Sequence, residues 1–566
     1  MEYSAIFHDM DKRFCYAIDK DLFVIRVQVK KDDMKEVILH YEDKYIPMER
    51  KDTRMTLPMK KVATSQFHDY YEAQLQMHLI CLRYFFEFTD MQGEKVYYGN
   101  YEFDKECITN RDRMFDCPQN LREEEMFEVP QWAANKVVYQ IFPSRFATTQ
   151  PVDKELWYKA PITPMDDLHG NLRGIIEHLD YIKDLGIDVV YLTPIFKSNS
   201  CHKYDTIDYY QVDPSFGTTE DLKELVQKSH ERGMKVVLDA VYNHTGREFF
   251  AFQDILEKGE KSKYLDWYFI DELPPRGEWG EIPNFKCFGY YGGMPKLNLK
   301  NPEVEKYITD VACYWIKECD IDGWRLDVGD EISHFFWKNF RKAIKAVKKD
   351  MLIIGEIWHY AGDFLEGDEW DTVMNYPFYL NLIDLLADEK INVSQFVQNL
   401  GYLKGRLNKK CYPLMWNLID SHDTARFLHL CNDNKKKQHL AAAFQLLLPG
   451  MPMVYYGDEY AMPGANDPDC RRGMYWDEEY QDKEMYNWYK KLMQIRKAHA
   501  SIVEGEMIET ITNDDDDTIV MIRKNGEETI AMLFNCGSSV KEFNEYAEKY
   551  NLLTDSAFDG KVDGLD

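Results

Sequence analysis

Alternating apolar and polar residues dominate the amino-terminal part of the chain. In Leu22–Lys30 the apolar residues at every second position from Phe23 to Val29 fall on one face of a strand, and Arg26 and Gln28 fall on the other. Further short strands, separated by polar turns, are expected at Val37–Tyr41, Tyr70–Met77, Leu82–Thr89 and Lys95–Tyr98. Residues 1–117 are therefore predicted to form a β-sandwich.

From Lys136 onward the pattern changes to short, continuous apolar runs that alternate with helical periodicity. These runs are Val137–Phe142, Val189–Phe196, Lys235–Asn243, Gly323–Val328, Leu352–Trp358, Thr372–Pro377, Met415–Ser421 and Met453–Glu459. Among the helices between them, Thr218–Arg232 starts with a capping box of Thr218 and Asp221 and ends at Gly233. Apolar strands buried on both faces indicate a parallel sheet, and eight of them alternating with helices predict a (β/α)8 TIM barrel.

One connection in this pattern is too long for a simple barrel. One helix and two loops need roughly 30 residues. The whole segment 244–322 separates the third run from the fourth, which is far longer. An inserted subdomain at about 245–300 is therefore expected over the barrel mouth. The predicted class is α/β, with a β-sandwich at 1–117, a linker at 118–135 that contains the acidic Glu123–Glu125, the barrel at 136–502 and a small C-terminal β domain at 503–566.

Charge and composition narrow the classes of partner. The formal net charge of −29 disfavours nucleic acid and anionic membranes, because a polyanion would be repelled. Lys435–Lys437 is interpreted as a solvated helix face rather than a phosphate site. The aromatic content of 14% suits a sugar-binding protein, although most aromatic residues are expected to fill cores.

Cysteine spacing and the first residues bear on the compartment. The twelve cysteines contain no C-x-x-C pair, which argues against a zinc ribbon or a disulfide framework and favours reduced thiols. Met1–Arg13 contains no apolar run, so no signal peptide is expected, and no stretch approaches the roughly 20 apolar residues of a membrane helix. A cytoplasmic protein is predicted.

Polar residues at the ends of the barrel strands are the candidates for chemistry, because catalytic groups of TIM barrels gather there. The third run leads into Asp239-Ala-Val-Tyr-Asn-His244, the fourth contains Arg325-Leu-Asp327, the fifth contains Gly355-Glu356, and the seventh leads into Asp420-Ser-His-Asp423. Carboxylates inside apolar runs carry a desolvation cost that a function would explain.

The strand period of two places Arg325 beside Asp327, so the guanidinium is expected to lower the pKa of that carboxyl and keep it ionised, as a nucleophile requires. The apolar residues before Glu356 are expected to favour its protonated form, as a general acid requires. A pair of carboxyl groups, one ionised and one protonated, is typical of glycosidases. The alternative is that Arg325–Asp327 is a structural ion pair and Glu356 a bridged carboxyl.

Several motifs resemble those of the α-amylase glycoside hydrolase family. They are D-x-V-x-N-H at Asp239–His244, G-W-R-L-D at Gly323–Asp327, G-E-x-W at Gly355–Trp358 and S-H-D at Ser421–Asp423. The subfamily of neopullulanases, cyclomaltodextrinases and maltogenic amylases is resembled by Met294–Asn298, His202–Thr206, Asp213-Pro214 with Phe216-Gly217, and Asn466–Arg472. The likeness spans about residues 3 to 550.

The resemblance implies a retaining double displacement at α-glucan linkages. Asp327 is the expected nucleophile, Glu356 the proton donor, and Asp423 the stabiliser of the distorted sugar. Expected substrate-binding residues are His244, Arg325 and His422 as hydrogen-bonding groups, Tyr204 as a stacking platform, Asp467 and Arg471 at the glycone end, and Asn243 as a supporting residue together with Asp239.

The segment after the nucleophile departs from the family pattern. It reads Val328-Gly329-Asp330-Glu331, where relatives usually show Ala-Asn-Glu. Glu331 is retained, whereas Gly329 and Asp330 depart from the pattern. In this subfamily Glu331 influences whether water or a sugar accepts the glycosyl group. Hydrolysis and glucan transfer therefore stay open as alternatives, and a non-catalytic glycan-binding protein is disfavoured because all three carboxylates are present.

The resemblance also implies substrates, a metal and an assembly. Expected substrates are cyclodextrins, maltooligosaccharides and pullulan, and the amino-terminal domain is expected to form a homodimer. Relatives bind calcium through a loop after the first barrel strand, but Ala147–Pro151 lacks the anionic oxygens that calcium prefers, so no cofactor is expected to be required. The C-terminal domain is expected to be short or truncated after Asn551.

Overall fold

The structure is a computed structural model that describes residues 1–47, 54–76, 81–100, 102–118, 126–277 and 280–565. Contacts divide the chain into two compact units. The first comprises Met1–Val129, Ala361–Asp368 and Ser394–Tyr412, and the second Pro130–Tyr360, Glu369–Val393 and Pro413–Asp566. Within the described ranges, no helix has both the length and the apolar character that a membrane span requires.

The first unit contains two antiparallel sheets around one apolar core, which confirms the predicted sandwich. One sheet has the order β1-β2-β6-β5, and the other β4-β3-β7-β8-β9 with β10 also paired to β7. The strands are β1 (Cys15–Ala17), β2 (Leu22–Lys30), β3 (Met34–Asp43), β4 (Met55–Pro58), β5 (Lys60–Thr64), β6 (His68–Gln76), β7 (Cys81–Asp90), β8 (Lys95–Tyr98), β9 (Phe103–Asp104) and β10 (Phe115–Pro118). Glu123–Glu125 of the predicted linker lie outside the described residues.

Strand β2 shows both the strength and the limit of the alternation pattern. Its predicted inner face, with Val27 and Val29, is fully buried. Arg26 on the opposite face is also buried, because its guanidinium lies 2.9 Å from Glu72 Oε2 and donates to the carbonyl oxygen of Leu407, which follows α10 (Val393–Arg406). A distant segment of the chain thus covers the polar face.

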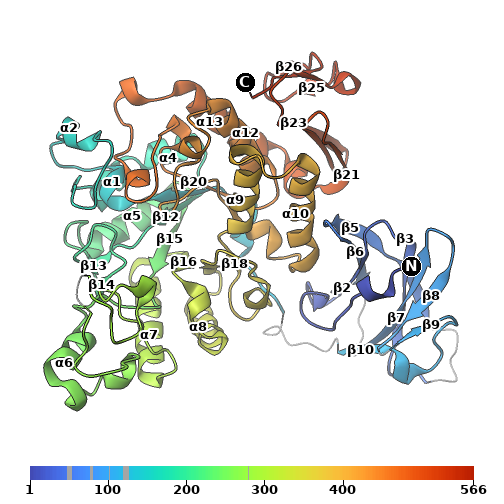
Figure 1. Ribbon diagram of the computed structural model, residues 1–566, viewed down its shortest axis with the longest axis horizontal. Coiled ribbons are helices and arrows are strands. Elements are labelled where there is room, and N and C mark those ends of the chain that lie inside the picture. The colour runs from blue at the N-terminus through green and yellow to red at the C-terminus, as the bar shows by residue number, and fades with distance from the viewer. Residues whose placement is uncertain (48–53, 77–80, 101, 119–125, 278–279, 566) are drawn as a thin grey trace. The chain divides into compact units, whose positions relative to one another are not determined.

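The second unit is built on eight parallel strands in the order β18-β17-β16-β15-β12-β11-β20-β19 (Figure 1). A parallel bridge between Met374 and Trp416 joins the two ends of this order and closes the barrel. The strands are β11 (Val138–Ile141), β12 (Val189–Leu192), β15 (Lys235–Ala240), β16 (Gly323–Leu326), β17 (Leu352–Gly355), β18 (Thr372–Val373), β19 (Trp416–Asn417) and β20 (Met451–Tyr455). Each lies in one of the predicted apolar runs or begins two residues before it, so the TIM barrel is confirmed.

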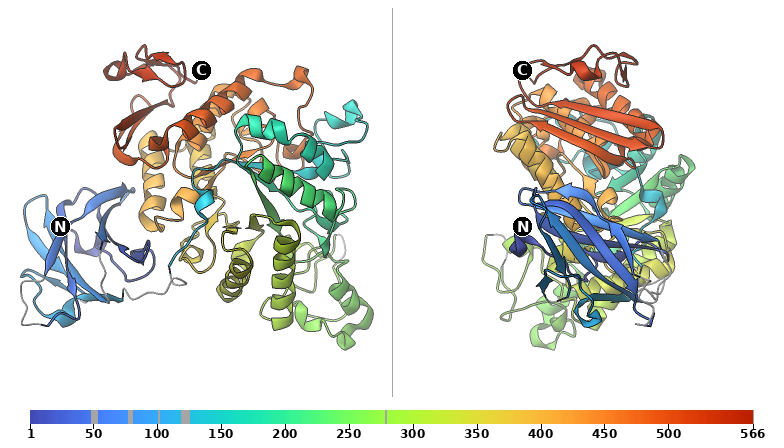
Figure 2. Two further views of the ribbon diagram at one scale, coloured as in Figure 1. Left: turned by 180° about the vertical axis from the view of Figure 1, so that it is seen from behind. Right: turned by 90° about the vertical axis from the view of Figure 1, so that its right-hand side faces the viewer.

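Helices surround these strands, as two further views show (Figure 2). Helix α5 follows the prediction, since Thr218 and Asp221 form the capping box and Gly233 has a positive φ of 69° just after the end. The helices of the second unit are α1 (Pro143–Phe146), α2 (Lys154–Trp157), α3 (Leu172–Glu177), α4 (Leu179–Leu185), α5 (Thr219–Glu231), α6 (Phe250–Lys258), α7 (Pro302–Cys319), α8 (His334–Val347), α9 (Tyr376–Leu382), α11 (Phe427–Leu430), α12 (Lys435–Leu447) and α13 (Lys483–Ala498).

Two additions to the barrel matter for the site. The hairpin of β13 (Phe196–Ser198) and β14 (Thr206–Val212) follows β12. In the long connection after β15, isolated bridges pair His244 with Lys296 and Tyr268 with Leu297, which brings the far end of the insertion back to the barrel.

The chain ends in a β region. Its main sheet is β21 (Glu506–Asn513), β22 (Thr518–Asn525) and β23 (Glu528–Asn535). Phe534 of β23 stacks on Phe444 of α12 with ring centroids 4.3 Å apart, so this sheet packs on a barrel helix within the second unit. The domain limits inferred from the sequence stay predictions.

Candidate active site

The pairing of neighbouring strands brings the candidate carboxyl groups to one level of the barrel. Asp239 of β15 pairs with Arg325 of β16, and Leu326 of β16 pairs with Gly355 of β17. Asp327 and Glu356 each follow the last of these paired residues, so they leave adjacent strands side by side. Since neighbouring strands lie about 4.8 Å apart, the two side chains start from positions close enough to flank one sugar linkage.

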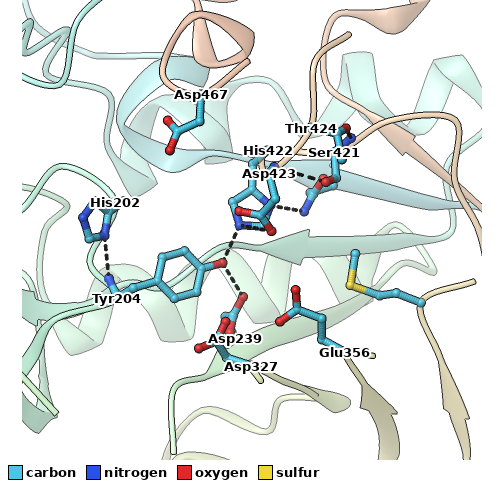
Figure 3. A network of polar contacts seen from close by, with 12 residues as sticks. His202, Tyr204, Asp239, Asp327, Glu356, Ser421, His422, Asp423, Thr424 and Asp467 are labelled. Carbon is cyan, nitrogen blue, oxygen red and sulfur yellow. Dashed lines mark hydrogen bonds and ion pairs between the residues drawn. The ribbon is translucent and has the colours of Figure 1, made fainter. Parts of the chain in front are cut away.

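A single guanidinium, that of the fully buried Arg325, links these carboxyls. Nη1 donates to Asp327 Oδ1 at 2.9 Å and lies 3.1 Å from Asp239 Oδ2. Nη2 lies 2.8 Å from Glu356 Oε2 and 3.9 Å from Asp423 Oδ2. Figure 3 shows the carboxyl groups of Asp327, Glu356 and Asp423 around a common space, so the three predicted catalytic residues meet.

The expected low pKa of Asp327 is wrong in direction. Burial raises the pKa of this carboxyl well above its usual value, and Arg325 opposes that shift without overcoming it. The physical reason is that one guanidinium serves four carboxyls, and the charges of Glu356, Asp239 and Asp423 raise the pKa further. Burial likewise raises the pKa of Asp239 to about 6, against the opposing charge of Arg325.

The surroundings of Glu356 are also more polar than the preceding apolar residues indicate. Its Oε2 accepts the backbone N–H of Val328 at 3.0 Å, and its Oε1 accepts the indole N–H of Trp358 at 3.1 Å. Apolar neighbours in the strand therefore do not enclose the carboxyl, because the side chain turns toward groups beyond the strand end. Trp358, which is 43% exposed, is a site residue that the sequence reasoning assigned no role.

Tyr204 connects two predicted site residues through its hydroxyl group. It donates to Asp239 Oδ2 at 3.0 Å and lies 2.5 Å from His422 Nε2. The amide nitrogen of Gln140 donates to His422 Nδ1 at 2.8 Å, so the hydrogen of a neutral ring is on Nε2, and burial lowers the pKa of His422. Tyr191 adds a donor to Asp239 at 2.6 Å.

Gln140 and Tyr191 were missed by the sequence reasoning. The available signal was that both are polar side chains within otherwise apolar strands, β11 and β12. Gln140 reaches the candidate site through His422, and Tyr191 reaches it through Asp239.

Asp423 is the most accessible of the three carboxyls, with its side chain 28% exposed. His422 Nε2 lies 3.2 Å from its Oδ2, and Arg471 Nη2 donates to its Oδ1 at 3.4 Å. Arg471 Nη1 also pairs with Asp467 Oδ1 at 2.8 Å. The two residues expected at the glycone end therefore meet Asp423 through one guanidinium.

Three predicted sugar contacts are covered by protein in the structure. Arg325, His422 and His244 each have 0% exposed surface. His244 stacks on Phe288 at 5.1 Å, its Nε2 lies 3.2 Å from the carbonyl oxygen of Tyr204, and burial lowers its pKa to about 3. Their direct contact with a sugar stays a prediction, and what the structure shows is that they support neighbouring groups.

Asn243 and Glu331 form a cluster with Lys296. Asn243 Nδ2 donates to Glu331 Oε2 at 3.0 Å, and Lys296 Nζ donates to Asn243 Oδ1 and to the carbonyl oxygen of Glu331. An ammonium group from the insertion thus ties the end of β15 to the segment after β16. The burial that lowers the pKa of Lys296 is opposed by Glu331.

The unusual Gly329 has a packing explanation. A Cβ at this position would meet Trp370 Cζ2 at 2.8 Å, and one at Gly355 would meet the same indole at 2.2 Å. The buried indole of Trp370 therefore lies against both glycines. The Asp330 carboxyl lies near a different residue, His359, whose Nε2 is 4.0 Å from Asp330 Oδ2.

Comparison with known proteins identifies the family to which these site residues belong. A family model described as the α-amylase catalytic domain matches residues 140–505, and one described as the α-amylase N-terminal Ig-like domain matches residues 1–119. The chain belongs to the α-amylase family. The predicted family membership is thereby confirmed, and the chain is a glycoside hydrolase of that family.

Several relatives carry names of the subfamily that the motifs resemble. A cyclomaltodextrinase of Geobacillus thermopakistaniensis (strain MAS1) is 40% identical over 574 residues, which cover 100% of this chain and 97% of that protein. Neopullulanase 2 of Thermoactinomyces vulgaris is 40% identical and covers 89% of this chain and 86% of its own length. The solved structure of a cyclomaltodextrinase matches with a TM-score of 0.91 at 39% identity, covering 96% of this chain and 92% of that one.

Proposed function

We propose that this α-amylase family member is a retaining α-glucan hydrolase with Asp327 as nucleophile, Glu356 as acid and base, and Asp423 as stabiliser of the distorted sugar. The observation that carries the proposal is the Arg325 guanidinium, which lies 2.9 Å from Asp327 Oδ1 on one nitrogen and 2.8 Å from Glu356 Oε2 on the other. Two carboxyl groups that contact the two terminal nitrogens of one planar guanidinium lie close together, as a retaining mechanism requires.

The chemistry proceeds in two displacements. Ionised Asp327 attacks the anomeric carbon while Glu356 gives its proton to the leaving oxygen, so a covalent glycosyl–enzyme ester forms. Glu356, now ionised, then takes a proton from water, which attacks the same carbon and releases Asp327. The hydrogen bond from Val328 N–H to Glu356 Oε2 supports this cycle, because it holds the carboxyl in place in both protonation states.

The proposed substrates are cyclodextrins and short maltooligosaccharides with α-1,4 linkages, and pullulan with some cleavage at α-1,6 linkages. Names of the relatives support this choice, since they include cyclomaltodextrinase and neopullulanase. Transfer to a sugar acceptor is the second candidate. It is favoured by two hydrogen bonds that fix Glu331 beside the site. The Asn243 amide donates to the Glu331 carboxylate, and the Lys296 ammonium donates to the Glu331 carbonyl oxygen. Product analysis at high maltose concentration separates transfer from hydrolysis.

The test uses β-cyclodextrin and α-maltosyl fluoride. Glu356→Gln is expected to lose release of reducing sugar from β-cyclodextrin but to keep attack on the fluoride, whose leaving group needs no proton. Asp327→Asn is expected to lose both activities. The first sugar released by wild type should be the α-anomer by NMR. An initial β-anomer, or equal losses in Glu356→Gln on both substrates, would sink the assignment.

We further propose a cytoplasmic homodimer that contacts its partner through the amino-terminal domain and needs no cofactor. The match of residues 1–119 to the α-amylase N-terminal domain supports the dimer, and the twelve free cysteines support a reducing compartment. Light scattering of the purified chain tests the dimer, and a monomer at micromolar concentration would contradict it. Activity measured after treatment with a chelator tests whether a metal cofactor is needed.

A further inference from the structure

A single amide group closes the loop after the first barrel strand. Asn171 Nδ2 lies 3.3 Å from Thr148 Oγ1, 3.5 Å from Thr149 Oγ1 and 3.2 Å from the carbonyl oxygen of His169. The side chain is held at its other end as well, because Asn171 Oδ1 caps α3 by accepting the N–H of Gly174 at 2.8 Å. Asn171 is buried, with 8% of its surface exposed.

These surroundings do not suit calcium, the metal that the family resemblance implies for this loop. Calcium takes about 6–8 oxygen ligands, usually including carboxylates, at about 2.3–2.6 Å. Here two hydroxyls and one carbonyl face the amide, and the nearby acids are engaged elsewhere. Asp166 pairs with Lys159 at 2.7 Å, and Asp167 lies 3.1 Å from His169 Nδ1. Among the described residues, no three His, Cys, Asp or Glu side chains are grouped to hold a metal.

We propose that the Asn171 amide does the structural work of a cation in this loop, and that one carboxylate at position 171 turns the loop into a calcium site. The hydroxyl oxygens of the half-buried Thr148 and the exposed Thr149 converge here with the His169 carbonyl oxygen, which has no hydrogen of its own and needs a positive partner. The two hydrogens of an amide nitrogen provide it as partial charges, with no ion to bind or lose.

Asn171→Asp is a sharp test because it separates the two ends of the side chain. Aspartate is as good a helix cap as asparagine, so the bond to Gly174 N–H is kept. The amide donor, however, is replaced by a carboxylate oxygen. The Thr148 and Thr149 hydroxyls can donate their own hydrogens to it, but it faces the His169 carbonyl oxygen with no hydrogen between them. Repulsion between the carboxylate and the His169 carbonyl oxygen should destabilise the variant, and a divalent cation that binds between them should restore its stability.

The experiment measures melting temperature and bound calcium for the full chain, dialysed against a chelator and then with or without millimolar calcium chloride. Wild type is expected to hold no stoichiometric calcium by elemental analysis and to melt at the same temperature under both conditions. Asn171→Asp should melt about 4 °C lower without calcium and regain most of the loss with it. Stoichiometric calcium in wild type, or a wild-type melting temperature that falls on chelation, would overturn the proposal.

Two further variants complete the test. Asn171→Ser keeps a capping oxygen but lacks the amide donor and adds no charge, so it should be destabilised and insensitive to calcium. Asn301→Asp makes the same chemical change at the N-cap of α7, where the amide nitrogen faces the Asp266 carbonyl at 3.4 Å, and it should show no calcium response. An Asn171→Ser variant as stable as wild type, or an Asn171→Asp variant that calcium does not rescue, would also contradict the proposal.

Discussion

Arg325 Nη1 donates to Asp327 Oδ1 at 2.9 Å, and the same nitrogen lies 3.1 Å from Asp239 Oδ2. The nucleophile candidate therefore shares its counter-charge with a second buried carboxyl. Burial is the main cause of the raised pKa of Asp327, and this sharing adds to it, because each additional carboxylate beside the guanidinium makes ionisation of the next one less favourable.

The first prediction concerns Asp239→Asn. An asparagine can still accept hydrogen bonds from Tyr191 and Tyr204, but it carries no charge. Loss of that charge lowers the pKa of Asp327, so its ionised form persists to lower pH. The acidic limb of kcat/KM, which reports the free enzyme, should move down by about one pH unit.

The matched control is Asp330→Asn, which removes a carboxyl that does not contact Arg325 and should leave the acidic limb in place. If the acidic limb of kcat/KM in Asp239→Asn does not shift, or shifts to higher pH, Asp239 does not set the ionisation of Asp327. Both profiles are measured on β-cyclodextrin.

Local periodicity predicted those relationships that lie within one strand. The period of two placed Arg325 and Asp327 on the same face, and the 2.9 Å contact confirms it. The same reasoning failed for the pKa of Asp327, because burial raises it and because Asp239, Glu356 and Asp423 reach the guanidinium from outside its strand. Their arrival depends on the register between strands, which a single strand's sequence does not contain.

A similar limit applies to burial. The alternation in β2 predicts which residues face the sandwich core, but Arg26 on the other face is covered by the segment that follows α10. The (β/α)8 barrel itself was predictable, because eight apolar runs alternating with helices allow few other folds. Gln140 and Tyr191 were not predicted, since a polar residue in a buried strand has no identifiable partner until the strands are arranged.

The second prediction concerns Trp358, whose indole N–H donates to Glu356 Oε1 and whose ring stacks on Tyr376 at 4.0 Å. Trp358→Phe keeps an aromatic ring on Tyr376 but removes the donor that orients the acid. It should lower kcat about tenfold with little change in KM. Trp358→Ala also removes an exposed aromatic surface, so KM for maltooligosaccharides should rise as well. Equal effects of the two variants on both constants would contradict separate roles for the N–H and the ring.

The third prediction concerns the backbone of Val328, which has a φ of 47°. A β-branched residue is strained in this left-handed region, whereas glycine is not. Val328→Gly should therefore be more stable than Val328→Ala by about 1 kcal/mol in urea unfolding. Val311, buried in the interior of α7, is the control, and there alanine should be the more stable replacement by a similar amount. The same order at both positions would mean that Val328 is not strained.

The fourth prediction concerns the stability of Asp327→Asn. The folded-state pKa of Asp327 is raised, so the folded protein holds a proton that the unfolded chain releases near pH 4. Between these two pKa values the wild type loses stability as pH rises, and above the folded-state value it carries the full penalty of a buried, ionised carboxyl. Asparagine has no such penalty.

The variant should therefore match wild type at about pH 4 and exceed it by about 1 kcal/mol at about pH 8, while its activity falls on the order of 10⁴-fold. Urea unfolding at both pH values measures the first effect, and β-cyclodextrin hydrolysis the second. Asp458→Asn is a useful comparison, because burial also raises the pKa of that carboxyl but its side chain pairs with Arg426 rather than Arg325. It should show a similar pH trend in stability without the same loss of turnover. If Asp327→Asn were less stable than wild type at the higher pH, its ion pair with Arg325 would be a net stabilising contact, and the energetic cost ascribed to the nucleophile would be absent.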